Sequence, residues 1–220
     1  FYMGGCPCPV AGFQESILYA LHAHTFIKAT AIVFLLLIPI TYFFGKVWCG
    51  WVCHLGAAQE LLYSKYDPAW LRTDFARKVL KSIRAILFII LIVHLAITNT
   101  IYWKQIDPFK SIFNLSVSGY VNTVLVILLL LSSIFIYRPF CKAACPVGLV
   151  LGWVGKLPGA ATMTKNIAVC KSCSACSKSC QMNAIRYGTN ESKVDTTDCT
   201  ACGDCIDVCK KNSMHIEALK

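Results

Sequence analysis

Eight cysteines in residues 166–220 limit the possible folds of this chain more than any other feature of its sequence. They form two runs with the same spacing, C-x2-C-x2-C-x3-C. The first run is Cys170, Cys173, Cys176 and Cys180, and the second is Cys199, Cys202, Cys205 and Cys209. Three closely spaced thiolates can bind three corners of one iron–sulfur cube, and the fourth cysteine of such a run ligates the other cube. The spacing therefore predicts two [4Fe-4S] clusters that share ligands crosswise.

We assign the eight cysteines as follows: Cys170, Cys173, Cys176 and Cys209 to the first cluster, and Cys199, Cys202, Cys205 and Cys180 to the second. A pair of zinc sites or a disulfide framework are the alternatives, but zinc sites more often use two C-x2-C pairs than runs of four. The tail resembles a bacterial-type 2[4Fe-4S] ferredoxin, which implies a small α+β domain over residues 166–220. It departs from that family at Gln181 and Lys210, where proline is usual.

The remainder of the chain, residues 1–165, is predicted to be an integral membrane domain that is mainly α-helical. The whole sequence is 56% hydrophobic with a mean hydropathy of +0.59, which is too apolar for a soluble ferredoxin. An apolar run covers residues 17–44, and we expect membrane-spanning helices at 26–44, 83–100 and 121–137. Each nearly crosses a hydrocarbon core of about 30 Å. Residues 1–16, with two prolines beside Cys6 and Cys8, are expected to be extended or tightly turned.

The net charge of +10 indicates how these spans are oriented. Basic residues concentrate in the loop 45–84, which marks the cytoplasmic side of the inner membrane. The tail should therefore be cytoplasmic, and the segment with Cys6 and Cys8 should lie outside. The charges do not form an aromatic-interleaved stripe, so we expect membrane lipid as a partner and no nucleic acid. Because three crossings are few for a stable bundle, we expect an upstream helix or a partner subunit to complete it.

A second set of cysteines follows two of the predicted spans. Cys49 and Cys53 follow the first span and Cys141 and Cys145 follow the third, with the same C-x3-C spacing. We interpret this as an internal duplication. If the two units pack about a pseudo-two-fold axis, their four thiolates meet near it and suit a third [4Fe-4S] cluster at the membrane boundary. Two thiol switches or simply buried thiols are the alternatives.

Two C-x3-C motifs behind apolar spans, followed by the 2[4Fe-4S] tail, resemble the NapH/NosR family of membrane iron–sulfur proteins. The matching residues are Cys49, Cys53, Cys141, Cys145, Pro146 and the eight tail cysteines, over most of residues 40–220. His54 is a departure, because the family has proline there. The resemblance implies electron transfer between the quinone pool, or a low-potential donor, and redox partners across the membrane.

Several further residues are candidates for cofactor binding. His94 should lie about 15 Å deep in its span, where it could hydrogen-bond a quinone or serve only in packing. His24 should lie near the outer surface, and this difference in depth disfavours a haem between the two histidines. His54 could tune or ligate a cluster, or be a polar residue of the turn. Cys6 and Cys8 could be free or oxidised thiols, or ligands completed by another subunit.

These features predict a membrane-bound electron-transfer subunit that relays electrons between cytoplasmic-side clusters and the quinone pool or a partner subunit of a redox complex. The alternative is an assembly or redox-regulatory factor for a metalloenzyme, with Cys6 and Cys8 binding a soft metal such as Cu(I). An ion-pumping complex is disfavoured because the spans lack a string of carboxylates. The sequence contains no nucleotide-binding loop, nucleophile triad or paired-carboxylate site, so it predicts no independent substrate site.

Overall fold

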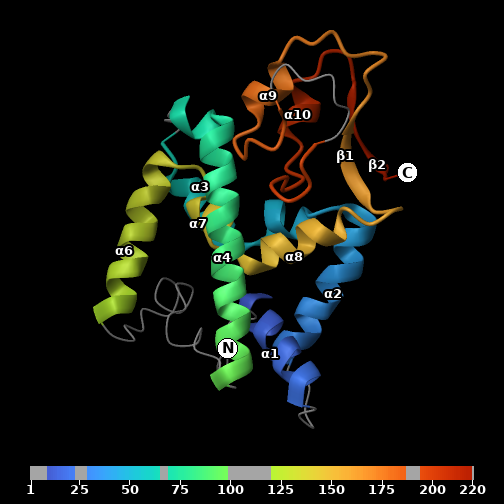
Figure 1. The fold of residues 1–220 in the computed structure, drawn as a ribbon. Coiled ribbons are helices and arrows are strands. Elements are labelled where there is room, and N and C mark those ends of the chain that lie inside the picture. The colour runs from blue at the N-terminus through green and yellow to red at the C-terminus, as the bar shows by residue number, and fades with distance from the viewer. Residues whose placement is uncertain (1–8, 23–28, 65–68, 99–119, 187–193, 220) are drawn as a thin grey trace. The chain divides into compact units, whose positions relative to one another are not determined.

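The computed structural model describes residues 9–22, 29–64, 69–98, 120–186 and 194–219 (Figure 1). The described part is mainly helical and contains one sheet of two antiparallel strands. The chain divides into two compact units, each assembled from segments that are distant in sequence. The helical unit comprises Phe1–Leu36, Gln59–Tyr66 and Leu80–Val147, and the tail unit comprises Leu37–Ala58, Asp67–Val79 and Gly148–Lys220.

The helical unit is held together by aromatic and polar contacts between its helices. Its elements are α1 (Pro9–His22), the start of α2 (Ala29–Phe44), the end of α3 (His54–Leu62), most of α4 (Asp74–Thr98), α6 (Tyr120–Phe135) and α7 (Pro139–Ala143). The ring of Phe13 in α1 lies 5.4 Å from that of Phe34 in α2 and 5.7 Å from that of Phe88 in α4. Buried Arg138 forms an ion pair of 2.5 Å with Glu60, which connects the start of α7 to α3.

For residues 9–16, helix α1 corrects the expectation of an extended or tightly turned segment, while residues 1–8 lie outside the described residues. The helix begins at Pro9 and continues to His22. Proline fits the first turn of a helix because its missing N–H would have no intrahelical partner there. Within the described residues, the apolar run 17–44 contains the end of α1 and all of α2.

Only one helix in the described part of the chain is long and apolar enough to cross a membrane. It is α4, whose 25 residues extend over Asp74–Thr98. The other predicted spans correspond to α2 and α6, each 16 residues long. At a rise of 1.5 Å per residue, 16 residues reach about 24 Å, which is less than a hydrocarbon core of about 30 Å. Three crossings therefore stay a prediction.

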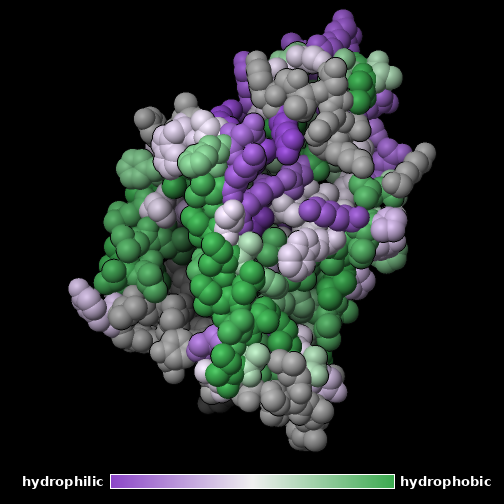
Figure 2. All heavy atoms as spheres, in the orientation of Figure 1, coloured by the Kyte–Doolittle hydropathy of each residue, from purple (hydrophilic) through white to green (hydrophobic). Residues whose placement is uncertain are grey.

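The exposed surface of α4 is nevertheless strongly apolar. Large hydrophobic side chains such as Ile89, Ile90 and Ile97 are exposed on it, and Figure 2 shows hydrophobic side chains over the lower part of this helix. Exposed isoleucines in such number need an apolar environment, which a lipid bilayer or a partner helix supplies.

The tail unit is built around the two-stranded sheet. Strand β1 (Ala161–Lys165) pairs with β2 (Met214–Ala218) in the register Ala161 to Ala218 through Lys165 to Met214. The short helices α9 (Ala175–Ser179) and α10 (Asp204–Asp207) accompany it. The buried core consists of Met163, Ala184, Val194, Cys205 and Met214, with other cysteines packed against it. The unit also contains a π-helical turn η1 (Trp48–Val52), a 3-10 turn η2 (Ala69–Arg72) and most of α8 (Pro146–Val154).

The sheet crosses the predicted boundary between residues 1–165 and 166–220. Strand β1 ends at Lys165, so it lies entirely before that boundary, yet it is the only hydrogen-bonded partner strand of β2 within the described residues. A strand leaves its backbone groups unpaired without a neighbour, so β1 belongs with the tail. Strand β1 has only five residues and a weak alternation of polar and apolar side chains, so the sequence did not predict it.

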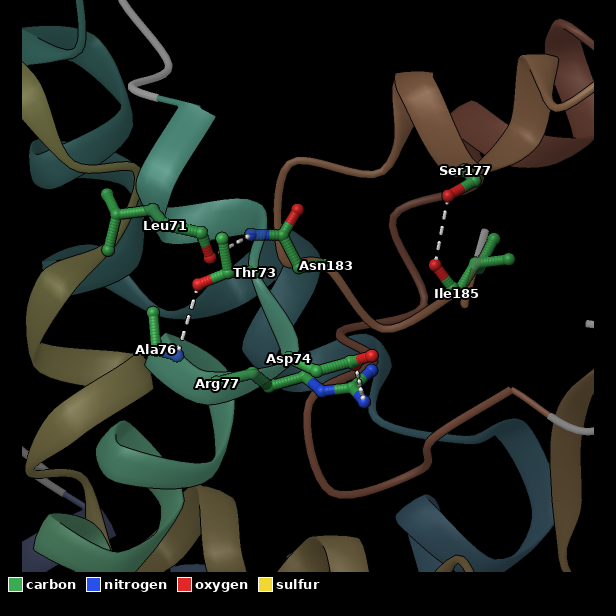
Figure 3. Close-up of polar contacts among 8 residues, drawn as sticks. All are labelled: Leu71, Thr73, Asp74, Ala76, Arg77, Ser177, Asn183 and Ile185. Atoms are coloured by element: carbon green, nitrogen blue, oxygen red, sulfur yellow. Dashed lines mark hydrogen bonds and ion pairs between the residues drawn. The ribbon is translucent and has the colours of Figure 1, made fainter. Parts of the chain in front are cut away.

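The start of α4 is anchored to the cysteine-rich part of the tail unit (Figure 3). Thr73 caps the helix, because its hydroxyl accepts a hydrogen bond of 3.3 Å from the N–H of Ala76. Just before it, the carbonyl of buried Leu71 accepts a bond of 3.3 Å from the side chain of Asn183. The side chain of Arg72 also donates to the carbonyl of Lys178. Leu71 and Arg72 are thus fixed to the loop after α9 and to α9 itself.

Asn183 has two structural roles that a substitution can separate. Its φ is 57°, a left-handed conformation that asparagine tolerates better than alanine. We predict that Asn183→Ala lowers the free energy of unfolding by about 2 kcal/mol, from the loss of both the backbone preference and the hydrogen bond. Asn183→Gly should lose about 1 kcal/mol, because it keeps the backbone preference. Denaturant unfolding measures both.

The matched control is Asn212→Ala, since Asn212 has a similar φ of 49° three residues after Cys209. This substitution should lower the free energy of unfolding by about 1 kcal/mol. Equal losses for Asn183→Ala and Asn212→Ala would show that the bond to Leu71 contributes nothing.

Candidate iron–sulfur centres of the tail unit

The four cysteines assigned to the first cluster line one cavity of about 470 Å³. Cys170 and Cys173 lie in the loop before α9, Cys176 lies in α9, and Cys209 follows α10. Cys173 is exposed and the other three are partly buried. The cavity thus brings together three residues of the first run and the last residue of the second.

The other four cysteines form a second, more buried group. Burial is the main cause that raises the pKa of Cys205 to about 12, and the neighbouring Cys199, Cys180 and Cys202 raise it further. Burial likewise raises the pKa of Cys180 to about 11, with contributions from Cys199 and Cys202. The thiols therefore lie close enough to influence one another. Without a compensating cation they stay protonated at neutral pH, because charging them would place several thiolates together in a poorly solvated site.

The two cysteine runs have the same backbone path. Residues with positive φ recur at equivalent positions, two, four and thirteen residues after the first cysteine of each run. They are Ser172, Ser174 and Asn183 in the first run and Ala201, Gly203 and Asn212 in the second. Five of these six are not glycine, and left-handed backbone is costly for them. This conformational free-energy cost occurs at matching positions in both runs, which indicates that the left-handed backbone is needed to position the cysteines.

Backbone N–H groups point at sulfur atoms in the same repeated way. The N–H of Ser172 lies 3.4 Å from Sγ of Cys170, and that of Ala201 lies 3.5 Å from Sγ of Cys199. The last cysteine of each run accepts a corresponding bond. The N–H of Ala184 lies 3.4 Å from Sγ of Cys180, and that of Ser213 lies 3.3 Å from Sγ of Cys209. Such donors stabilise thiolate charge. The hydroxyl of Ser213, 3.1 Å from Sγ of Cys209, is the main cause that lowers the pKa of Cys209 to about 7.

The segment with the first C-x3-C motif packs against the loop of the second group. A Cβ at Gly50 in η1 would lie 2.5 Å from the carbonyl oxygen of Thr200, so only glycine allows this approach. The indole N–H of Trp51 donates to the carbonyl of Ala201 at 3.3 Å. Helix α8 also contacts this loop, because a Cβ at Gly152 would lie 2.7 Å from Cα of Thr197. Residues 196–201 are thus contacted by two segments, η1 and α8, that precede residue 166 in the sequence.

Lys46 places a cation beside the second group. Its side chain is buried, and Nζ donates to the carbonyl of Thr197 at 2.9 Å and to that of Gly148 at 3.2 Å. Burial raises the pKa of Cys199, and the N–H of Ala201 and the charge of Lys46 both oppose that rise. A cation in this position favours negative charge at the second group.

The remaining predicted ligands fall in both units. Cys49 lies in η1 and Cys53 directly follows it, within the tail unit. Cys141 lies in α7 and Cys145 directly precedes α8, within the helical unit, where Arg84 donates to the carbonyl of Cys141 at 3.3 Å. Joint binding of a third cluster by these four cysteines stays a prediction.

The histidines show no shared site in the described part of the chain. His94 lies within α4, and its Nδ1 is 3.4 Å from the hydroxyl of Thr98 one turn later. His54 is the first residue of α3 and is exposed. His24, Cys6 and Cys8 lie outside the described residues. Roles for these residues stay predictions.

The donor set of the two groups suits iron–sulfur clusters. Both consist of thiols alone, and none of the twelve described cysteines forms a disulfide. Among the residues that the structure describes, no three histidine, cysteine or carboxylate side chains converge closely enough to hold a single metal ion. The first four cysteines instead line a cavity, an arrangement that fits a group with four separate corners.

Comparison with known proteins indicates iron–sulfur binding, although the matching family model covers the segments with Cys49, Cys53, Cys141 and Cys145 and not the eight tail cysteines. The 4Fe-4S binding domain family matches residues 27–78 and 118–162. The ferredoxin-type protein NapH of Escherichia coli is 28% identical over 182 residues, which cover 78% of this chain and 61% of NapH. These matches confirm the resemblance to NapH/NosR-type iron–sulfur proteins.

Two further relatives of the NapH/NosR type support the same conclusion. The methylamine utilization ferredoxin-type protein MauN of Paracoccus denitrificans is 28% identical over 158 residues, or 70% of this chain and 55% of MauN. The regulatory protein NosR of Pseudomonas aeruginosa is 28% identical over 172 residues, or 72% of this chain and 23% of NosR. The chain spans about 60% of the length of the NapH proteins that it matches. No solved structure matches. An iron–sulfur, ferredoxin-type electron-transfer role is supported.

Two residues of the candidate centres were not predicted from the sequence. Lys46 stands alone between an apolar helix and Cys49, and that isolated cation was an available signal. Ser213 follows the last cysteine by four residues, but serine is common in loops and carried no signal.

We predict that Lys46 raises the reduction potential of the second cluster only. Lys46→Met should shift its midpoint to more negative values, because the reduced cluster carries one more negative charge. We expect about a tenfold change in the reduced-to-oxidised ratio at a fixed potential, or about 59 mV for one electron. Redox titration followed by EPR measures it. Lys46→Arg should keep most of the effect, and Lys156→Met, at an exposed lysine, should have none. An unchanged midpoint in Lys46→Met would refute the role.

Proposed function

We propose that this chain is a membrane-bound iron–sulfur electron-transfer subunit. It relays electrons between two [4Fe-4S] clusters in its tail and the quinone pool or a partner redox subunit. The observation that carries the proposal is the crosswise grouping of the tail cysteines, in which each group combines three residues of one run with the last residue of the other. Two thiolate sites in one small unit suit stepwise transfer of single electrons.

The chain's own residues fit this role in three ways. When bound, each cluster takes up and releases one electron without changing its ligands. The N–H groups that point at the sulfur atoms stabilise the charge of both oxidation states and shift the potential. Buried Cys205 and partly buried Cys180 limit the access of water to the second group, whereas exposed Cys173 leaves the first group open to a partner.

The membrane side of the proposal rests on α4 and on the duplicated cysteine motif. Helix α4 supplies a length and composition that suit a membrane anchor. The contact of η1 with residues 200 and 201 supports a route from the second cluster toward Cys49. A third cluster held by Cys49, Cys53, Cys141 and Cys145 completes that route. Quinone exchange then requires a site at membrane depth, for which His94 is the candidate.

Anaerobically purified protein tests the main proposal. After reduction with dithionite we expect EPR signals of at least two [4Fe-4S] clusters that interact magnetically, because one small unit holds both. Added quinone analogue should reoxidise them in the membrane-reconstituted protein. Signals that persist in the presence of every quinone tested would leave relay to a protein partner as the function. Colourless, iron-free protein would overturn the proposal.

Iron counting tests the third cluster. The intact chain should contain about twelve irons, and Cys49→Ser and Cys141→Ser should each reduce the number to about eight. Cys209→Ser is the matched control, because it removes a ligand of the first cluster and should leave the membrane-boundary cluster spectroscopically unchanged. About eight irons in the intact chain would reject the third cluster.

A regulatory or maturation role is the second candidate, and the match to the regulatory protein NosR favours it. In that case the clusters sense or supply electrons for a metalloenzyme, and the chain associates with its partner only transiently. Quantitative copurification separates the two roles, because a permanent subunit should be recovered in a fixed one-to-one ratio with its complex.

A further inference from the structure

The cavity of the first cluster has a strongly basic lining. Five of its lining residues carry a positive charge, and among the described residues that line it none is acidic. The basic residues are Lys165, Lys171, Arg186, Lys210 and Lys211. They come from four separate places in the chain, namely the end of β1, the first cysteine loop, the segment after α9 and the segment after Cys209. The fold therefore gathers cations around this cavity.

Acidic residues accompany the second group instead. The charge of Asp204, the first residue of α10, contributes to the raised pKa of Cys202, after burial. Asp195 contributes in the same way at Cys199. The two groups have the same backbone path, but Lys46 is accompanied by Asp195 and Asp204 at the second group, whereas five cations and no described acidic residue line the first cavity. The basic lining of the first cavity therefore exceeds the single cation beside the second group.

The basic cavity is also the accessible one. Cys173 is exposed, and Val208, which lines the cavity, is 39% exposed. Ile167 and Val169, immediately before Cys170, are 48% and 47% exposed. Exposed apolar side chains within a charged rim are typical of transient protein interfaces. Electron tunnelling weakens steeply with distance, so a soluble partner must dock where a cluster is nearest the surface.

We propose that the rim of the first cavity is the docking surface for a small acidic one-electron carrier protein, whose carboxylates surround its own redox group. This inference rests on the proposed function and adds the class of partner and the place of contact. When the carrier's redox group is a flavin, one electron leaves the anionic reduced flavin, which becomes the neutral semiquinone, and reduces the oxidised cluster from its 2+ to its 1+ state. No bond forms or breaks, and no proton has to move.

Flavodoxin, a small acidic flavoprotein, is the probe. With the intact chain in nanodiscs of neutral lipid, we expect saturable binding whose association rate falls steeply as salt is raised, because exposed charges are screened. The double variant Lys171→Gln/Lys211→Gln should lower the association rate about tenfold at low salt. The matched control Lys156→Gln/Lys178→Gln removes the same charge from exposed lysines that do not line the cavity. It should change the rate less than twofold.

Three outcomes overturn the proposal. Equal losses in the two double variants would mean that only the net charge attracts flavodoxin. Binding that is insensitive to salt would exclude a charged interface. If the double variant Lys171→Gln/Lys211→Gln loses affinity for vesicles with anionic lipid but keeps its affinity for flavodoxin, the rim contacts membrane lipid instead. Reduction by dithionite, followed by EPR, is measured in parallel. If dithionite produces no cluster signal, the proposed function fails; if the signal forms while flavodoxin binding fails, only this inference is lost.

Discussion

Thiolates that lie side by side repel one another and lose solvation when they are buried, and the tail unit is arranged around this constraint. The raised pKa values of Cys180 and Cys205 express the constraint directly. Bound iron removes it, because metal ions displace the thiol protons and neutralise the charge. Backbone donors to sulfur assist in both runs. Folding of the tail and assembly of its clusters are therefore expected to be coupled, as in other small metalloproteins.

The same constraint explains why segments far from the tail take part in its packing. The loop 196–201 contains Cys199 of the more buried group. Helix α8 packs against its start and η1 packs against its end. Glycines at both contacts allow backbone to approach backbone. Lys46 then adds a cation that also fixes the carbonyls of Thr197 and Gly148. Charge compensation and packing at the second group thus depend on residues that precede the predicted ferredoxin-like domain, Lys46 and Gly50 by more than a hundred positions.

Much of the candidate site could be predicted from the sequence, because cysteine spacing reports local geometry. The crosswise grouping followed from the spacing of the runs, and the structure gathers the same two sets of side chains. The resemblance to NapH/NosR-type proteins was confirmed by comparison. Long-range contacts were not predictable in this way. Neither the contact of Gly50 with Thr200 nor the pairing of β1 with β2 leaves a local pattern, since each joins segments that are far apart in the sequence. Helix α1 was missed because prolines near its start were interpreted as favouring extended chain.

The position of β1 has a consequence for the modularity of the protein. Cleavage between Lys165 and Asn166 would separate all eight tail cysteines from the rest of the chain, yet it would remove one of the two strands of the sheet. It would also remove η1, α8 and Lys46 from the second cysteine loop. The ferredoxin-like part is therefore not a detachable carrier domain. Its redox chemistry is expected to depend on Lys46, η1, α8 and β1, which belong to the same unit but precede residue 166.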